Sequence, residues 1–198
     1  SCGKFLASGS WDKTVRIWSF DYATAQGEEV TKLKGHTGLV ISVAWSLCGQ
    51  FLASGSHDDT VRIWSFDLKM CQGQEFSVLE GHTDWIESLM WSPCGKFLAS
   101  ASFDKTIRVW SFDSKKYKKQ EVTVLQGHTG VIWSVVWSPC GTFLASGSGD
   151  RTVRIWCFDF VTRQGNVVST FEGHIRTVTS VSWSPCGQFL TSGSFDKT

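Results

Sequence analysis

The chain has 198 residues, a net charge of +1 and 14% aromatic residues, with 11 Trp and 14 Phe among them. A charge so close to zero gives no overall field that would attract nucleic acid or an acidic substrate. The chain also has no basic-then-apolar leader and no apolar run of membrane-spanning length. We therefore expect neither a nucleic-acid partner nor a membrane partner.

One order of residues recurs along the chain at a fixed spacing. Residues 127–156 read GHTGVIWSVVWSPCGTFLASGSGDRTVRIW. The same series begins, at intervals of 46 residues, at Gly35, Gly81, Gly127 and Gly173. A fixed period of this length indicates a repeat architecture, in which each unit is stabilised by contact with its neighbours.

Each repeat predicts short strands separated by turns. In residues 127–172 the predicted strands are Val131–Trp137, Phe143–Ser148, Val153–Trp156 and Asn166–Phe171. Pro139 and Gly141 favour a turn after the first strand, because Pro has a preset φ and Gly tolerates a positive one. Asp150 favours a tight turn after the second strand, since its side chain can accept bonds from nearby backbone N–H groups. Such runs are typical of antiparallel hairpins.

In chain order, the repeats form three full units and two partial ones. Residues 1–34 supply a second strand, Phe5–Ser10, with a third and a fourth strand but no first strand. Residues 173–198 supply only a first and a second strand, Val178–Trp183 and Phe189–Ser194. The full units are predicted at 35–80, 81–126 and 127–172.

The repeat resembles the WD40 repeat. The resemblance rests on the Gly-His pair, the Asp six residues before a Trp and the four strands per unit, and it extends over the whole chain. It implies an all-β fold, a β-propeller whose blades are four-stranded antiparallel sheets. The Asp that follows Trp in the family's name is replaced here by Ser19, Ser65, Ser111 and Cys157. With four blades' worth of strands, we expect a fragment of a larger propeller, an excised piece, or one half of a dimeric propeller.

Most of the seven cysteines occupy one position of the repeat, in the turn between the first and second strands: Cys2, Cys48, Cys94, Cys140 and Cys186. This places them on separate blades, too far apart for disulfide bonds. The odd total and the missing leader favour a reducing compartment, the cytoplasm or the nucleus. No Cys-x-x-Cys pair is present, so we predict no zinc site and no cofactor.

Four residue types recur at one spacing in every full repeat. These tetrads are His36, Ser54, Asp58 and Trp64; His82, Ser100, Asp104 and Trp110; and His128, Ser146, Asp150 and Trp156. Ser, His and Asp could form a hydrolase triad. They can also form a closed chain in which Trp donates to Ser, Ser to His and His to Asp. Because a triad in every blade would have its Ser occupied by Trp, we predict a structural role, which the WD40 resemblance also implies.

A second set of positions varies from blade to blade. One precedes the Asp of each tetrad, and two follow each repeat His by three and five residues. The resemblance implies that all of them face one end of the propeller, which we call the top face. These residues are Trp11, Leu39, Ile41, His57, Trp85, Glu87, Phe103, Val131, Trp133, Thr177, Thr179 and Phe195. Large aromatic side chains at loop positions suit either cover by a neighbouring loop or an interface.

Two classes of function follow from these patterns. We expect a non-catalytic scaffold that binds other proteins or peptides through the top face. The alternative is an enzyme or small-molecule binder at the central channel, where Glu87 is the one acid among the first-strand positions. Among scaffolds, the motifs Trp-Ser-Pro-Cys-Gly and Ser-Phe-Asp are similar to those of the WD40 scaffold of cytosolic iron–sulfur cluster assembly. A role in that assembly is therefore an alternative.

Three further expectations concern charge and the chain ends. The loop at 115–119 is strongly basic and is a second candidate for an acidic partner. The repeated arginines at 16, 62, 108 and 154 are expected to pack over aromatic faces between blades. The two ends carry complementary halves of a tetrad, so self-association through the open end blades is expected.

Overall fold

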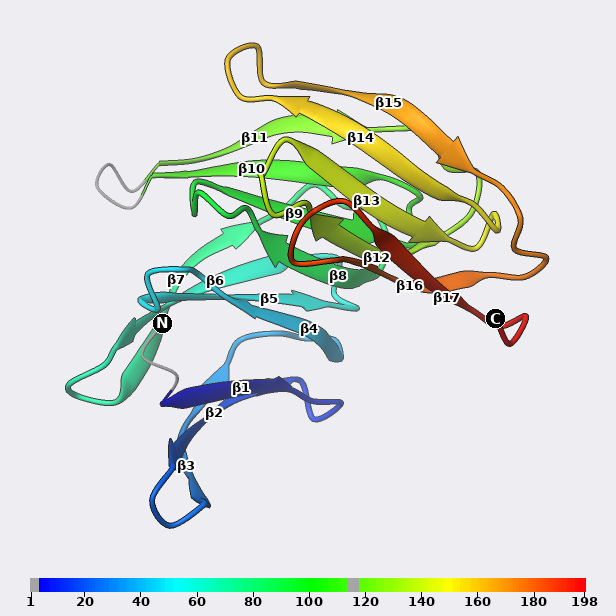
Figure 1. Cartoon of the computed structure of the whole chain (residues 1–198). Helices are drawn as coiled ribbons and strands as arrows, with labels where there is room; N and C mark the ends of the chain where they lie inside the picture. Colours follow the sequence, from blue (N-terminus) through cyan, green and yellow to red (C-terminus); the bar gives the residue numbers. More distant parts are fainter. Residues whose placement is uncertain (1–3, 114–117) are drawn as a thin grey trace. The chain divides into compact units, whose positions relative to one another are not determined.

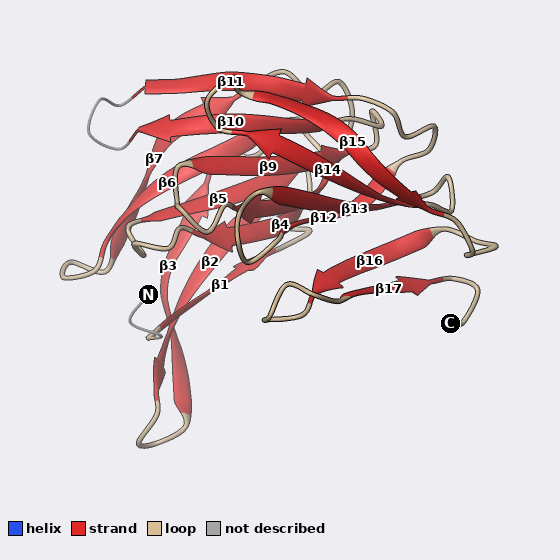
Figure 2. Ribbon diagram, turned by 45° about the horizontal axis from the view of Figure 1, so that its top comes forward, coloured by secondary structure: helices blue, strands red, loops and turns tan. Residues whose placement is uncertain are grey.

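The computed structural model describes residues 4–113 and 118–198, and within them the regular structure is β-strand, without a helix (Figure 1 and Figure 2). The chain divides into two compact units, Ser1–Ile86 and Glu87–Thr198. The all-β fold class predicted from the sequence is confirmed.

The first unit contains two antiparallel sheets. One is three-stranded, with the order β1-β2-β3, and the other is four-stranded, with the order β4-β5-β6-β7. The strands are β1 (Phe5–Gly9), β2 (Thr14–Asp21), β3 (Gln26–Lys34), β4 (Val40–Trp45), β5 (Phe51–Ser56), β6 (Val61–Asp67) and β7 (Gln72–Leu79). The three-stranded sheet has the second, third and fourth strands of a repeat, as the sequence predicts.

The second unit contains two four-stranded sheets and one hairpin. Their orders are β8-β9-β10-β11, β12-β13-β14-β15 and β16-β17. The strands are β8 (Ile86–Trp91, starting at the last residue of the first unit), β9 (Phe97–Ser102), β10 (Ile107–Asp113), β11 (Lys118–Leu125), β12 (Ile132–Trp137), β13 (Phe143–Ser148), β14 (Val153–Asp159), β15 (Gln164–Phe171), β16 (Val178–Trp183) and β17 (Leu190–Ser194).

The turns have the chemistry that the sequence predicts. Between β12 and β13, Gly141 has a φ of 78°, and its N–H donates to the Ser138 carbonyl at 2.9 Å. Between β13 and β14, the Thr152 N–H donates to the Asp150 carboxylate at 3.0 Å. Arg151 at the centre of this turn has a φ of 73°, an uncommon value for a residue with a Cβ. The same left-handed position recurs in the other repeats, so it belongs to the repeat itself.

Apolar residues from adjacent sheets form the core within each unit. In the first unit Val15 and Ile17 of β2 belong to one buried cluster with Leu52 of β5 and Trp64 of β6. In the second unit a cluster joins the sheets that begin with β8 and β12, and a further one joins β13 and β14 to Val178 and Val181. Burying these side chains stabilises each sheet against its neighbour, as expected of a repeat protein.

Some predicted strand limits were wrong by one to three residues. The largest difference is in β14, which continues past Trp156 to Asp159. It continues because Phe158 is buried, and because Cys157, Phe158 and Asp159 stay paired with β15. The strand ends where the Asp159 carboxylate accepts the Val161 N–H at 2.7 Å and closes the next turn.

Candidate functional site

The tetrad of the sheet β4–β7 forms a chain of hydrogen bonds. Trp64 Nε1 donates to Ser54 Oγ at 2.8 Å, and Ser54 Oγ lies 2.7 Å from His36 Nε2. His36 Nδ1 lies 2.8 Å from a carboxylate oxygen of Asp58. The same oxygen accepts the Thr37 N–H, and the other oxygen accepts the hydroxyl of Thr60. The chain of bonds thereby ties the segment before β4 to the turn between β5 and β6.

The tetrad of β12–β15 repeats this geometry. Trp156 Nε1 donates to Ser146 Oγ at 2.8 Å, and His128 lies 2.8 Å from Ser146 Oγ and 2.7 Å from Asp150. Burial lowers the pKa of His128 and outweighs the attraction of Asp150. Burial raises the pKa of Asp150, but hydrogen bonds from Thr152, His128 and the Thr129 N–H outweigh it and lower that pKa to about 2. At neutral pH the pair is therefore a neutral imidazole beside an ionised carboxylate.

The remaining repeats contain parts of the same arrangement. Trp110 donates to Ser100 at 2.9 Å, and Trp18 donates to Ser8 at 2.9 Å. In the hairpin β16–β17, His174 lies 2.8 Å from both Ser192 and Asp196. The Ser hydroxyls at 54, 100 and 146 are fully buried, and each accepts an indole N–H. A hydroxyl in that state is screened from a substrate, which argues against a nucleophilic role.

The turn between the second and third strands lies beside the start of the first strand. The His57 N–H donates to the Leu39 carbonyl at 2.9 Å, the Gly149 N–H to that of Val131 at 2.8 Å, and the Phe195 N–H to that of Thr177 at 3.0 Å. In each of these repeats a backbone hydrogen bond therefore joins the position before the tetrad Asp to the position three residues after the repeat His.

Two pairs of predicted top-face rings are in contact. The imidazole of His57 stacks on the indole of Trp85, with ring centroids 4.1 Å apart and an interplanar angle of 5°. Phe103 and Trp133 meet edge to face at 5.2 Å. Trp85 is still 43% exposed. His57 thus covers one face of the Trp85 indole, while part of that side chain stays in solvent.

The other predicted top-face residues are less closely grouped. Trp11 is 78% exposed and Phe195 is 62% exposed. The remaining positions, each partly buried, are Leu39, Ile41, Glu87, Val131, Thr177 and Thr179. No ring contact joins Trp11 to another described residue of its unit.

Three of the positions five residues after a repeat His have a property that the sequence analysis missed. The strand register shifts at Ile41 of β4, at Trp133 of β12 and at Thr179 of β16. A β-bulge leaves one residue outside the ladder and re-aims its side chain. One sequence signal could have indicated the bulge in β12, namely the consecutive apolar residues Ile132 and Trp133, which interrupt the alternation expected of a strand.

The repeated arginines make a contact that was not predicted. Arg16 pairs with Glu29, Arg62 with Glu75 and Arg108 with Glu121. Each pair joins the third and fourth strands of one blade, whereas we expected packing between blades. A Glu thirteen residues after each Arg was the available signal. Arg154 has Val167 at the corresponding place, and neither a hydrogen bond nor an ion pair from its side chain is found in the described part of the chain.

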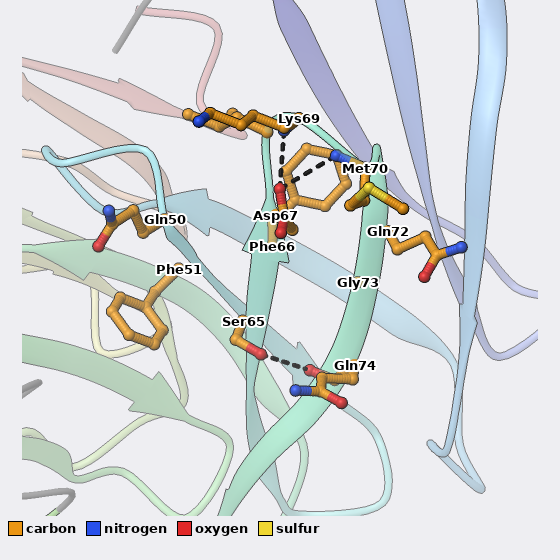
Figure 3. Close-up of a pocket in the computed structure, with 11 residues that line it drawn as sticks. Gln50, Phe51, Ser65, Phe66, Asp67, Lys69, Met70, Gln72, Gly73 and Gln74 are labelled. Carbon is orange, nitrogen blue, oxygen red and sulfur yellow. Dashed lines mark hydrogen bonds between the residues drawn. The ribbon is translucent and has the colours of Figure 1, made fainter.

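A hollow within the first unit lies at the opposite end of its blade from the tetrad turn. It has a volume of about 690 Å³ and lies between the turn before β5 and the hairpin β6–β7 (Figure 3). The Asp67 carboxylate at its edge accepts the N–H groups of Lys69 and Met70, and Ser65 Oγ donates to the Gln74 carbonyl. The Asp67 carboxylate and the Ser65 hydroxyl are thus engaged within the hairpin.

Four other expectations concern the cysteines, a metal site, a membrane span and the basic loop. The six cysteines within 4–113 and 118–198 are all free thiols. Within the same residues no group of three or more His, Cys, Asp or Glu is arranged to hold a metal ion, and no helix has the length and hydropathy to cross a membrane. The basic loop at 115–119 lies outside the residues whose side chains are described.

Comparison with known families gives one match. The family model described as "WD domain, G-beta repeat" matches residues 1–19, 27–65, 73–111, 119–157 and 165–198, which is most of the chain. No curated protein matches the chain. The similarity to the iron–sulfur assembly scaffold therefore has no support from these comparisons.

Proposed function

The chain belongs to the WD40 repeat family, and we propose that it is a non-catalytic scaffold that binds a protein or peptide partner through its top face. Members of this family are generally protein-interaction scaffolds and generally lack catalysis. The fold alone would not decide between the two classes of function, so the proposal depends on the residues at the top face.

The observation that carries the proposal is a contrast between two sets of positions. The tetrad residues are the same in each full repeat, and their polar atoms bond to one another. The top-face positions change from blade to blade, and they include the indole of Trp85, which His57 covers on one face and which is 43% exposed. A constant frame with a variable, partly aromatic end is the arrangement expected of a recognition surface.

Trp85 and Trp133 are the proposed anchors. His57 stacks flat on Trp85, and Phe103 meets Trp133 edge to face, so both indoles are held in place before a partner arrives. Trp is enriched among residues that dominate interface energies, and a preordered ring loses little conformational entropy on binding. We expect each to contribute about 2 kcal/mol or more to the free energy of binding if it lies at the centre of the interface.

The test is capture of a partner by the wild-type chain and by the Trp85→Ala, Trp133→Ala double variant. A partner recovered from cell extract with the wild type is purified and titrated against both proteins. The expected result is a loss of affinity of about a hundredfold or more, because two anchors of this size are removed. Thermal unfolding of both proteins shows whether the variant remains folded.

A matched control uses exposed apolar residues elsewhere on the chain. Val168 and Phe171 lie on β15, are 54% and 52% exposed, and have no place at the top face. The Val168→Ala, Phe171→Ala double variant should bind the partner as the wild type does. If the Trp85 and Trp133 variant bound the partner as tightly as the wild type, or if only the β15 control lost binding, the binding site would not lie at the top face.

A further inference from the structure

Gly149 lacks the ring that His57 and Phe103 supply at the corresponding position of two other repeats. The residue before the tetrad Asp is His57 in one blade and Phe103 in the next, and both rings touch a Trp. Gly149 occupies the same position in the blade β12–β15. A Cβ placed on it would make only ordinary contacts, the nearest with Val131 N at 3.6 Å. The nearest side-chain atom is Trp133 Nε1 at 3.9 Å, so this position has room for a Cβ beside the indole.

A hollow of about 340 Å³ lies at this place, wholly within the second unit. Its lining comes from the turn between β13 and β14, the segment before β16 and the turn after β17: Gly149, Arg151, Ile175, Arg176, Thr177 and Phe195. The residues that line this open hollow thus include two arginines and a threonine, and the surface that they expose in it is mostly polar.

Among the described residues, Arg151 and Arg176 make neither a side-chain hydrogen bond nor an ion pair. Three of the four repeated arginines behave differently, since Arg16, Arg62 and Arg108 each pair with a glutamate. The two arginines of the hollow therefore retain their full capacity to bind an anion.

The carboxylates next to the hollow are already occupied. Both oxygens of Asp150 accept hydrogen bonds, one from His128 and the Thr129 N–H and the other from Thr152. Both oxygens of Asp196 accept bonds in the same way, from His174, the Ile175 N–H and Thr198. These carboxylates close the tetrads, so they are not available to neutralise Arg151 and Arg176 by direct contact.

The backbone beneath the two arginines is fixed by the repeat. The Arg151 N–H donates to the Ser148 carbonyl at 3.1 Å, and the Arg176 carbonyl accepts the hydroxyl of Ser194 at 3.1 Å. Arg176 corresponds to Gly130 and Asp84 in the two preceding repeats, so this positive charge is particular to the last repeat. Only the long side chains remain to be ordered by a ligand, which limits the entropy lost on binding.

We infer that this hollow, the Arg151–Arg176 site, binds an oxyanion carried by the partner polypeptide, with an apolar residue beside it. Guanidinium groups bind carboxylate and phosphoryl oxygens through paired, charge-assisted hydrogen bonds. Ile175 and Phe195 are 73% and 62% exposed and offer the apolar neighbour a surface. The inference rests on the proposed function, because it names the chemistry by which the top face would recognise its partner.

The test is titration of the full chain with three short peptides that differ at one residue. The central residue is Glu, phosphoserine or Gln, and it is followed by Leu in each peptide. The side-chain N–H signals of Arg151 and Arg176 are followed by NMR. Saturable shifts are expected with the Glu or the phosphoserine peptide and are not expected with the Gln peptide. The tighter of the two anionic peptides identifies the source of the oxyanion.

Two variants serve as the probe and its control. Arg151→Gln, Arg176→Gln should weaken binding of the anionic peptide by about tenfold or more. Arg163→Gln removes a guanidinium of the same kind, exposed on a turn and with a φ of 58°, and should leave binding unchanged. Equal shifts with the Gln peptide, or equal loss in the Arg163 variant, would overturn the inference.

The peptide titration and the partner capture test different claims, so the failure of one can be distinguished from the failure of the other. If the anionic peptides do not bind but capture still depends on Trp85 and Trp133, the oxyanion site is wrong and the proposed scaffold stands. If the anionic peptides bind at Arg151 and Arg176 but the Trp85 and Trp133 variant captures the partner as the wild type does, the Arg151–Arg176 site stands and the proposed anchors are wrong.

Discussion

Replacing Trp156 with alanine is expected to lower the free energy of unfolding by about 3–5 kcal/mol. The indole is 1% exposed, belongs to the main buried cluster of the second unit and donates to Ser146 at 2.8 Å. Its loss leaves a cavity and removes one bond of the tetrad. Urea unfolding followed by circular dichroism measures the change, which is a large part of the stability of an ordinary domain.

The control for this change is Trp11→Ala. Trp11 is 78% exposed, so its removal should shift the free energy of unfolding by less than about 0.5 kcal/mol. Similar effects of the two substitutions would contradict the division of the tryptophans into buried frame residues and exposed top-face residues.

Replacing His128 with alanine is expected to lower the free energy of unfolding by about 1–3 kcal/mol. The change leaves the buried hydroxyl of Ser146 and the carboxylate of Asp150 without the partner that they share. No esterase or other hydrolytic activity should be lost, since the proposed role of the tetrad is structural. Hydrolysis by the purified chain that Ser146→Ala abolished would contradict this role.

The matched control is His174→Ala. His174 makes the same two contacts, but Ser192 is exposed, so water can replace the lost bond and the effect should be smaller. The pH dependence gives a second check. Because the folded-state pKa of His128 lies below its ordinary value of 6.5, the unfolded chain binds more protons just below pH 6.5. Stability should therefore fall as pH drops below 6.5, and less steeply in the His128 variant.

The architecture could be predicted from the sequence because every repeat contains the same turn residues and strand patterns. Turn residues such as Gly141 and Asp150 fix where strands end, and those predictions agree with the hydrogen bonds observed. Strand ends that depend on tertiary burial were less predictable. The extension of β14 to Asp159 follows from the burial of Phe158 beneath a neighbouring sheet, which a local pattern does not specify.

The residues of the candidate site are a prediction from the sequence, whereas their contacts appear only in the structure. The repeat spacing picked out His57, Trp85, Phe103 and Trp133 as variable positions, but which rings would touch depends on the packing of adjacent blades. The bulge at Trp133 was missed for the same reason, since it appears only in the register of two paired strands. The hollow beside Gly149 was missed because an absent side chain leaves no pattern of its own.

The most direct test of the scaffold account is amide hydrogen exchange of the chain with and without its captured partner. Exchange reports protection residue by residue, so it locates the contact without a substitution. The account predicts slower exchange at the top-face segments 57–60, 83–87, 103–106 and 129–133, with little change in the outer strands β7 and β15. Protection confined to those outer strands, with the top-face segments unchanged, would contradict it.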